Sequence, residues 1–267
     1  MGSALFQPFP MLPARRAQVW RHQPNYRRPR HFHGEPEINF VARGEAVLGV
    51  GDSTLRLSAG DLIVLPPGLD HELVEASDEL QLFVLALTPE LAATAYDPFA
   101  HATSQTRRLD GARAHELESL LLALSTVQNP GTVEASLADV FRTTLEALRP
   151  RHVLSRRALL TWREDRDLSE TALAARLKVD RATLSRCLRD DLGAKFVDYR
   201  ARHRVMTFIA LADGGRPLSS AALEAGFGSY AQCHRVFWRL LGCSPSAYLR
   251  GERSVIADIV AGPHTAK

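Results

Sequence analysis

The stretch GFGSYAQCHRVFWRLLGCSPSAY, residues 226–248, decides the fold of the C-terminal part of the chain. Its two leading glycines predict a turn, and Ser229 is a good N-cap for a helix that runs to about Leu241. Gly242 is well placed to end that helix. The side chains expected on the outer face of the helix are Tyr230, Ala231, His234 and Arg235. The stretch therefore predicts a tight turn followed by a short helix with a basic outer face.

The same pattern occurs once earlier in the chain, about 50 residues upstream. LSETAL at 168–173 recurs as LSSAAL at 218–223, an offset of 50 residues. Three more residues recur at an offset of 49: Arg186, Gly193 and Tyr199 correspond to Arg235, Gly242 and Tyr248. An internal repeat of this length indicates two copies of one small helical unit.

In the first copy, Ser169 can cap one short helix and Asp180 the next, which is expected over 181–192. The outer face of this second helix is expected to carry Arg181, Ala182, Ser185, Arg186 and Arg189. Two short helices joined by a three-residue turn, the second one basic, are typical of a helix-turn-helix that enters the major groove. In the second copy the first helix is expected to be capped by Ser219 or Ser220. A longer helix over 196–211 would join the two motifs.

The charge of the chain is distributed unevenly. Residues 1–150 hold 13 Lys+Arg and 18 Asp+Glu, a balance of −5, whereas residues 151–250 hold 18 and 10, a balance of +8. This asymmetry predicts that the C-terminal part alone meets a polyanion.

The C-terminal hundred residues resemble the AraC/XylS-type transcription regulators, most specifically over residues 226–248. Carried over by position, the resemblance implies base-reading roles for Ala182, Ser185 and Arg186 in the first motif and for Tyr230, Ala231, His234 and Arg235 in the second. The chain departs from the family at Cys233, where an aromatic is usual, at Trp238, where a lysine or arginine is usual, and at Phe208, where a small residue is usual. We interpret these as packing variants, although Trp238 removes one phosphate contact.

The N-terminal part has a different pattern. From Ile38 to Leu87 short apolar alternations are separated by glycine turns, which predicts an all-β sandwich or barrel. Two amphipathic helices are expected after Pro98, over 115–127 and 133–148, separated by the breaker Asn129-Pro130-Gly131. Two interpretations of these helices stay open, because they could form a dimer interface or cover an open face of the barrel.

A second motif lies in the β-rich part. His31-x-His33, Glu37 and Gly44, followed by Gly60, Pro66-x-Gly68 and His71, resemble both signature motifs of the cupin superfamily. The resemblance implies that His31, His33, Glu37 and His71 converge inside the barrel on a divalent metal, with Glu75 replacing a usual asparagine. Three imidazoles and a carboxylate suit zinc, nickel, iron or manganese. The alternative is that the same four residues line a pocket for an organic effector.

Together these patterns predict a two-domain α+β chain: an N-terminal cupin-like β-barrel with a helical linker, and a C-terminal all-α domain of two helix-turn-helix motifs joined by a helix. The expected bounds are 1–97 for the effector-binding barrel, 98–150 for the linker, 151–250 for the DNA-binding domain and 251–267 for a tail. We expect a cytoplasmic protein for three reasons. The three cysteines have no close pairing, prolines interrupt the first twenty residues, and no apolar run reaches membrane-spanning length.

The favoured function is a sequence-specific transcription regulator whose DNA binding or activation depends on a small molecule or metal in the barrel. A pure metal sensor differs from it only in the effector. The alternative from another class is a metal-dependent cupin enzyme, of the dioxygenase or isomerase type, with an accessory DNA-binding domain. No nucleophile motif or phosphate loop is recognisable, so no catalytic residue is expected and the enzyme would depend wholly on the metal. Expected partners are double-stranded promoter DNA and the effector, with RNA polymerase and a second copy of the chain as further candidates and no membrane.

Overall fold

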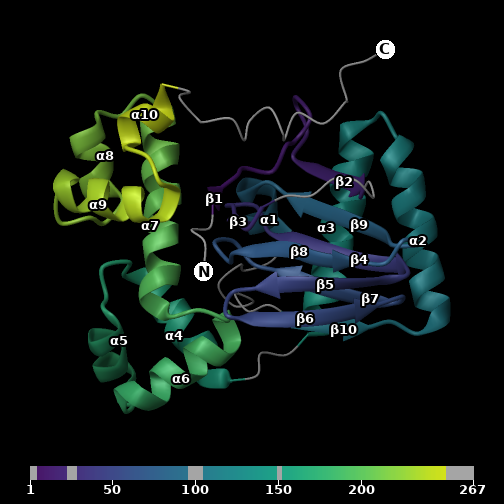
Figure 1. Ribbon diagram of the computed structural model, residues 1–267, viewed down its shortest axis with the longest axis horizontal. Helices are drawn as coiled ribbons and strands as arrows, with labels where there is room; N and C mark the ends of the chain where they lie inside the picture. The colour runs from purple at the N-terminus through teal and green to yellow at the C-terminus, as the bar shows by residue number, and fades with distance from the viewer. Residues whose placement is uncertain (1–4, 23–28, 96–104, 149–151, 251–267) are drawn as a thin grey trace.

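The computed structural model describes residues 5–22, 29–95, 105–148 and 152–250, so the expected tail 251–267 lies outside the described residues. A β-rich unit lies on one side and a helical unit on the other, with a long helix, α7 (Phe196–Asp213), running along the boundary between them (Figure 1). The chain is thus a two-domain α+β protein, as the sequence predicted.

The β-rich unit is built from two five-stranded sheets. The first has the order β1 (Leu5–Phe6), β3 (His31–Phe32), β8 (His71–Ala76), β5 (Glu45–Val50), β6 (Ser53–Ser58). The second has the order β10 (Gln105–Arg108), β7 (Asp61–Leu65), β4 (Glu37–Arg43), β9 (Gln81–Leu87), β2 (Ala17–Arg21). Neighbouring strands are antiparallel except for β1 and β3, which are parallel. The two sheets enclose a buried core, and this arrangement is compatible with the expected cupin-like barrel.

Strand β4 is buried on both faces and shows how the sequence positions the interior of the barrel. Successive side chains of a strand point to opposite faces. Ile38 and Phe40 pack outward against helices, while Val41 packs in the core between the sheets. Glu37 and Asn39 are also buried, and a hydrogen bond joins their side chains. The barrel interior therefore receives polar groups from a strand whose other face is wholly apolar.

Three helices flank the second sheet: α1 (Pro89–Ala95), α2 (Gly111–Thr126) and α3 (Pro130–Glu146). Leu121 of α2 and Leu137 and Phe141 of α3 are fully buried and share one core with Phe83 and Leu85 of β9. The pair α2–α3 therefore covers a sheet face, which was one of the two interpretations left open. The dimer interface stays a prediction. The short strand β10, which pairs with β7, was not expected in this segment.

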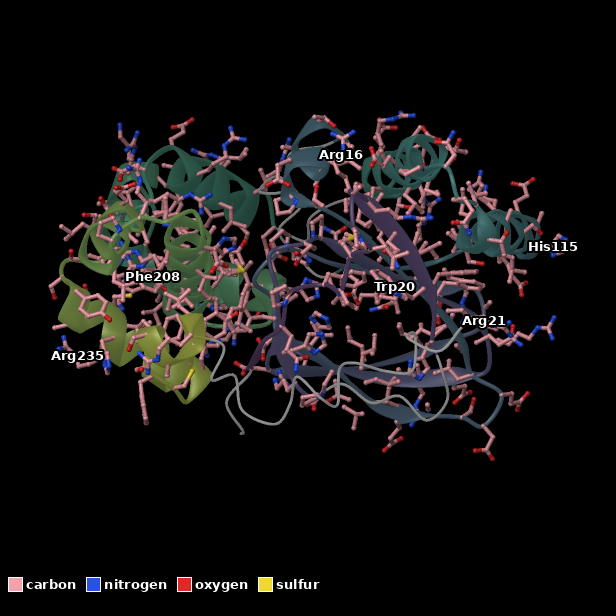
Figure 2. All side chains as sticks on the ribbon, turned by 90° about the horizontal axis from the view of Figure 1, so that it is seen from above. Arg16, Trp20, Arg21, His115, Phe208 and Arg235 are labelled. Atoms are coloured by element: carbon pink, nitrogen blue, oxygen red, sulfur yellow. The ribbon has the colours of Figure 1, made fainter. Side chains whose placement is uncertain are left out.

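The helical unit contains seven helices. These are α4 (Val153–Glu164), α5 (Glu170–Leu177), α6 (Arg181–Leu192), α7, α8 (Leu218–Glu224), α9 (Tyr230–Leu241) and α10 (Pro245–Leu249). Helix α7 contributes to two separate cores, with Phe196 and Tyr199 in the first and Val205 and Phe208 in the second. Phe208 is fully buried among the helices, which fits its interpretation as a packing variant (Figure 2). Each helix-turn-helix copy thus has its own core, joined rigidly through one helix.

The ends of both second helices lie where the sequence predicted them. The Asp180 carboxylate accepts a hydrogen bond from Thr183 N, and the Ser229 hydroxyl accepts one from Gln232 N. Gly193 and Gly242 end the two helices in the left-handed conformation, at φ 62° and 70°. The expected cap of α8 was wrong: Pro217 precedes its first residue, and Ser219 and Ser220 lie inside the helix. The fixed φ of proline favours this earlier start.

Candidate functional site: a buried histidine cluster and two exposed helices

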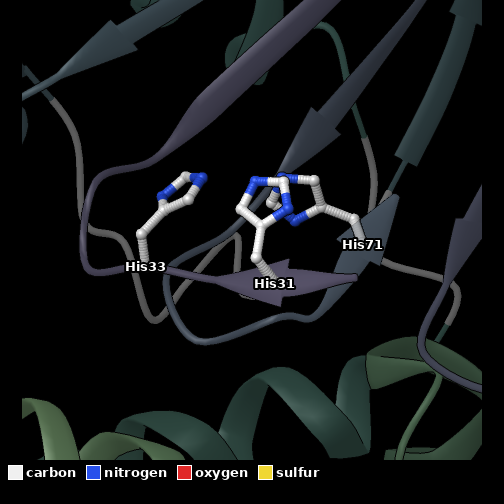
Figure 3. A group of neighbouring side chains, drawn as sticks. All are labelled: His31, His33 and His71. Carbon is white, nitrogen blue, oxygen red and sulfur yellow. The ribbon is translucent and has the colours of Figure 1, made fainter. Parts of the chain in front are cut away.

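Three histidines meet inside the barrel, as the sequence predicted. His31 lies on β3, His33 follows that strand, and His71 begins β8, where it pairs directly with His31 across the sheet. All three are buried, and three ring nitrogens, one from each histidine, all lie within 4.8 Å of one another (Figure 3). The described residues contain no other group of three such side chains with metal-binding spacing.

The backbone fixes the orientation of each imidazole. His31 Nδ1 lies 2.8 Å from Pro29 O, His33 Nδ1 lies 2.8 Å from Glu35 O, and His71 Nδ1 lies 3.0 Å from Leu69 O. A carbonyl oxygen only accepts, so in each ring Nδ1 carries the proton and donates it. The second nitrogen, Nε2, then bears a lone pair in the neutral ring. Metal-ligating histidines commonly have this second hydrogen bond, which sets the tautomer and raises ligand basicity.

Glu37 completes the cluster from the other sheet. The strand that carries His31 ends at Phe32, and Glu37 begins β4. The Glu37 Oε2 atom still lies 3.1 Å from His33 Nε2 and 3.7 Å from His71 Nε2. The four residues therefore meet because the two sheets face each other.

Two features hold Glu37 as a carboxylate. Asn39 donates a hydrogen bond of 2.8 Å to its Oε1 atom. Burial alone raises the pKa of Glu37, but the charge of His71 and the hydrogen bond to His33 outweigh it and hold that pKa well below its usual value. The negative charge thus sits in a dry interior where only a proton or a cation can balance it.

The donor set fits a divalent cation. With Nδ1 of His33 donating to Glu35 O, the 3.1 Å between His33 Nε2 and the Glu37 carboxylate holds either a proton on Nε2, as in the hydrogen bond that lowers the pKa of Glu37, or a cation in its place. Two acceptors at that distance repel each other unless a proton or a metal ion lies between them. Three imidazoles and one carboxylate are the ligands that zinc and similar ions prefer.

Sequence reasoning missed two neighbours of the cluster. Asn39 could have been found, because it follows Glu37 by two positions on one strand and so shares its face. Phe9 could not: it precedes the barrel in the chain, yet its ring packs 5.6 Å from His33 and 4.1 Å from Trp20. Glu75, which the motif comparison singled out, is exposed on β8 away from the cluster.

The second candidate site is the outer surface of α6 and α9. In α6, Leu184 and Leu188 are buried, Ser185 is half-buried, and Arg181, Ala182, Arg186 and Arg189 are exposed. Arg181 also pairs with Glu170 of α5 at 3.3 Å. The basic face that the sequence predicted for this helix is therefore turned to solvent.

Helix α9 has the same character. Cys233 and Phe237 are buried, whereas Ala231 and Arg235 are exposed, and Arg235 lies at the outer end of the molecule (Figure 2). Tyr230 and His234 are half-buried, and the Tyr230 ring packs at the edge of the second core. Trp238, one of the departures from the family pattern, has 56% of its surface exposed two turns from the start of the helix.

The arginines of α7 are engaged within the protein instead. Arg200 donates to Leu168 O at 2.8 Å, and Arg204 pairs with Asp167 at 3.2 Å. Their guanidinium groups hold the loop before α5 against α7. Arg200 and Arg204 are therefore not part of the exposed basic faces of α6 and α9. No helix in the described residues is both long and apolar enough to cross a membrane.

Comparisons with known proteins agree with this division. Residues 19–153 match the family model of the AraC-like ligand binding domain, and residues 173–251 match a helix-turn-helix domain model. The probable transcriptional regulator LumQ of Photobacterium leiognathi is 26% identical over 232 residues, which cover 82% of this chain and 90% of that protein.

Solved structures that the chain matches include ToxT of Vibrio cholerae strain SCE256, bound to an unsaturated fatty acid. It is 16% identical, with a TM-score of 0.48, over 87% of this chain and 94% of that one. The C-terminal domain of AraT, a response regulator of Geobacillus stearothermophilus, is 24% identical, with a TM-score of 0.36, over 38% of this chain and 86% of that one. Because the ligand-binding model alone matches half of the chain and a helix-turn-helix model follows it, the protein belongs to the AraC family and is a DNA-binding transcription regulator with a ligand-binding domain, not an enzyme.

Proposed function

We propose that the protein binds promoter DNA through α6 and α9 and that a divalent metal ion, held by His31, His33, His71 and Glu37, is the effector that changes this binding. The observation that supports the metal is the meeting of three buried imidazoles, with ring nitrogens within 4.8 Å of one another, and the Glu37 carboxylate, which lies 3.1 Å from His33 Nε2. Zinc, nickel, iron and manganese all accept this ligand set, and geometry selects among them.

The chain's own residues supply the rest of such a site. The carbonyl oxygens of Pro29, Glu35 and Leu69 hold the three imidazoles in one tautomer, and Asn39 holds the carboxylate. The Phe9 ring lies against His33 and excludes water on that side. A cation bound there would gain a preformed, dry ligand set.

For DNA, the proposed base-contacting residues are those exposed on the two second helices, with Arg186 and Arg235 in equivalent positions. An arginine can bind the O6 and N7 atoms of guanine with two hydrogen bonds. Arg181 and Arg189 border these positions, where phosphates would lie, and the half-buried Ser185, Tyr230 and His234 stay proposed as base-reading residues.

The test measures metal and DNA binding on the same full-length protein. Protein freed of metal with a chelator is titrated with ZnCl₂ by calorimetry, and its affinity for the DNA upstream of its own gene is measured by fluorescence anisotropy with and without Zn²⁺. We expect one ion per chain and a change in DNA affinity of about 5-fold or more, the usual range of allosteric coupling.

The variant His33→Ala with His71→Ala should lose both the ion and the response. His115→Ala, which removes an exposed imidazole of α2, is the matched control and should keep both. Circular dichroism melting shows whether the double variant is folded, and His33→Gln replaces it if it is not. A wild type that takes up no Zn²⁺, Ni²⁺, Fe²⁺ or Mn²⁺ would overturn the metal and leave an organic effector for the same cavity.

A further inference from the structure

Arg202 of α7 points into the β-rich unit, unlike the exposed arginines of α6 and α9. Its guanidinium pairs with the Asp70 carboxylate and lies 5.7 Å from the centre of the Phe32 ring. Only 11% of its side chain is exposed. An arginine so enclosed is not available to a DNA phosphate. Its partner, Asp70, lies 132 positions earlier in the chain.

Asp70 has a second cationic partner from its own domain. Arg30 Nε lies 2.6 Å from Asp70 Oδ2, and Arg30 also reaches Glu72 at 3.1 Å and the carbonyl of Gly51. The Asp70 side chain is 6% exposed. One buried carboxylate is therefore shared by a guanidinium of the barrel and a guanidinium of the connector helix. We call Arg30, Asp70 and Arg202 the Asp70 cluster.

The surface around the Asp70 cluster is closely packed. Gly68, with φ at +79°, approaches α7 so closely that a Cβ there would lie 3.0 Å from His203 Nε2 and 3.3 Å from Met206 Cε. His203 is itself buried against Trp162 and Tyr199, and this burial lowers the pKa of its imidazole to about 3, so the ring stays neutral. The loop before His71 therefore packs directly against α7, the helix that joins both DNA-binding motifs. Neither can shift relative to the other without breaking these contacts.

A second contact fixes the other end of the boundary. The amide of Asp52 donates to the carbonyl of Gly193, in the turn between α6 and α7. A Cβ on Gly51 would overlap that carbonyl, so the two backbones meet directly. The barrel therefore contacts the first helix-turn-helix at the end of α6 and the connector at its middle.

Residues that form the contact between the two units are direct neighbours in sequence of residues of the histidine cluster. Arg30, His31, Phe32 and His33 are consecutive, and Asp70 immediately precedes His71. The imidazoles lie on one side of the His31 strand and helices run along its other side (Figure 3). A shift of this strand or of the loop before His71 changes both sets of contacts at once.

We propose that the Asp70 cluster is the contact through which occupancy of the histidine cavity controls the docking of the DNA-binding unit. Drawing His31 and His71 toward one ligand shifts Phe32 and Asp70 against Arg202, and the change in docking alters the orientation of α6 and α9. This proposal rests on the proposed function in one respect, since it takes the histidine cavity as the effector site.

The first test is a double-mutant cycle on the thermal stability of the full-length protein. Asp70→Ala leaves Arg202 facing Arg30 without its carboxylate partner, while Arg30 keeps only Glu72, so its melting temperature should fall more than that of Arg202→Ala. Adding Arg202→Ala to Asp70→Ala should then raise the melting temperature again, because one of the two opposed cations is gone. Additive losses in the double variant would overturn the sharing of Asp70.

The second test is the DNA response to Zn²⁺. In wild type we expect the DNA dissociation constant to change about 5-fold or more on adding Zn²⁺, and in Arg202→Ala less than about 2-fold, with Zn²⁺ uptake retained. Arg202→Lys keeps the charge and should restore part of the response. Arg108→Ala is the matched control, because it removes an arginine–aspartate pair, with Asp61, from the far sheet.

The outcomes separate the two proposals. An Arg202→Ala variant that responds to Zn²⁺ as wild type does would overturn the role of the Asp70 cluster and leave the proposed function intact. A wild type that takes up no Zn²⁺ would overturn the metal effector, and the stability cycle then decides whether Asp70 joins the two units.

Discussion

Arg235 combines an exposed guanidinium with an equivalent residue, Arg186, in the other helix-turn-helix copy. Both lie on helices whose opposite faces are buried in separate cores. An exposed arginine contributes little to stability through surface ion pairs. The position of Arg235 on the outer face of a basic helix is therefore the reason to expect that it contacts a base.

Replacing Arg235 by alanine should weaken specific DNA binding by about 1–3 kcal/mol and relax discrimination at one base pair. Anisotropy titrations against the operator and a set of single-base variants would measure it. Arg142→Ala, on α3 of the barrel, controls for the loss of one positive charge. Equal weakening on all sequences, with a smaller salt dependence, would assign Arg235 to a phosphate instead.

Among the cysteines, Cys233 differs from the other two. It is fully buried in the second core, and burial raises the pKa of its thiol to about 12, whereas Cys187 and Cys243 are half-buried. The thiolate is the reactive form, so Cys233 should resist modification. With a chromogenic disulfide reagent at pH 8, the native protein should react at two thiols and the third should react only in denaturant. Cys233→Ser should remove that slow thiol; three fast thiols in the native protein would contradict the packing.

At the scale of elements, the stability that the N-cap of α9 contributes can be measured by itself. The Ser229 hydroxyl accepts from Gln232 N at 3.1 Å. Ser229→Ala should cost about 1 kcal/mol of the free energy of unfolding, measured by urea denaturation. Ser219→Ala is the control, because Ser219 is exposed inside α8 and alanine is the better helix former. A comparable loss at Ser219 would mean that Ser219 is the cap and that α8 begins two residues later.

Elements bounded by local chemistry could be predicted from the sequence. The bounds of α6 follow from Asp180 and Gly193, which act on backbone groups within a few residues of themselves. The histidine cluster could be named as well, because its residue types and spacing match a known motif. The helix bounds depend on interactions between near neighbours in the chain, whereas the cluster was named only through its resemblance to that motif.

Contacts that depend on tertiary packing could not be predicted. The break between β3 and β4 places His31 and Glu37 in different sheets, so the meeting of Glu37 with the histidines depends on how the sheets face each other. The pairing of Asp70 with Arg202 joins distant segments, and no local pattern distinguishes Arg202 from its neighbours Arg200 and Arg204. The three arginines occupy alternate positions of one helix, yet each has a different partner.

At the scale of the whole molecule, one ion pair ties α3 to the chain that enters β2. Arg16 Nε lies 3.0 Å from Glu134 Oε2, and Arg16 N donates to Oε1 at 3.2 Å. The hydrogen bond from the Arg16 side chain lowers the pKa of Glu134 below its usual value. A carboxylate with a lowered pKa contributes stability above its unfolded-state pKa and loses it as the pH falls through the folded-state value.

Glu134→Gln should therefore melt at a lower temperature than wild type at pH 7, and the difference should close as the pH falls below about 4. Melting curves from pH 7 to pH 3 measure it. Glu116→Gln, which changes an exposed carboxylate of α2, should show no such convergence. A difference that persists unchanged in acid would show that Glu134 acts through packing and not through its charge.

The core that α2 and α3 share with the second sheet determines how the protein can be divided. A fragment that stops at residue 97, where the β pattern of the sequence ends, would leave Phe83 and Leu85 facing water and should aggregate on expression. A fragment that continues through Leu148 keeps this apolar face covered. A fragment for ligand screening or crystallisation should therefore extend to Leu148, which makes it about half again as long as one that stops at residue 97.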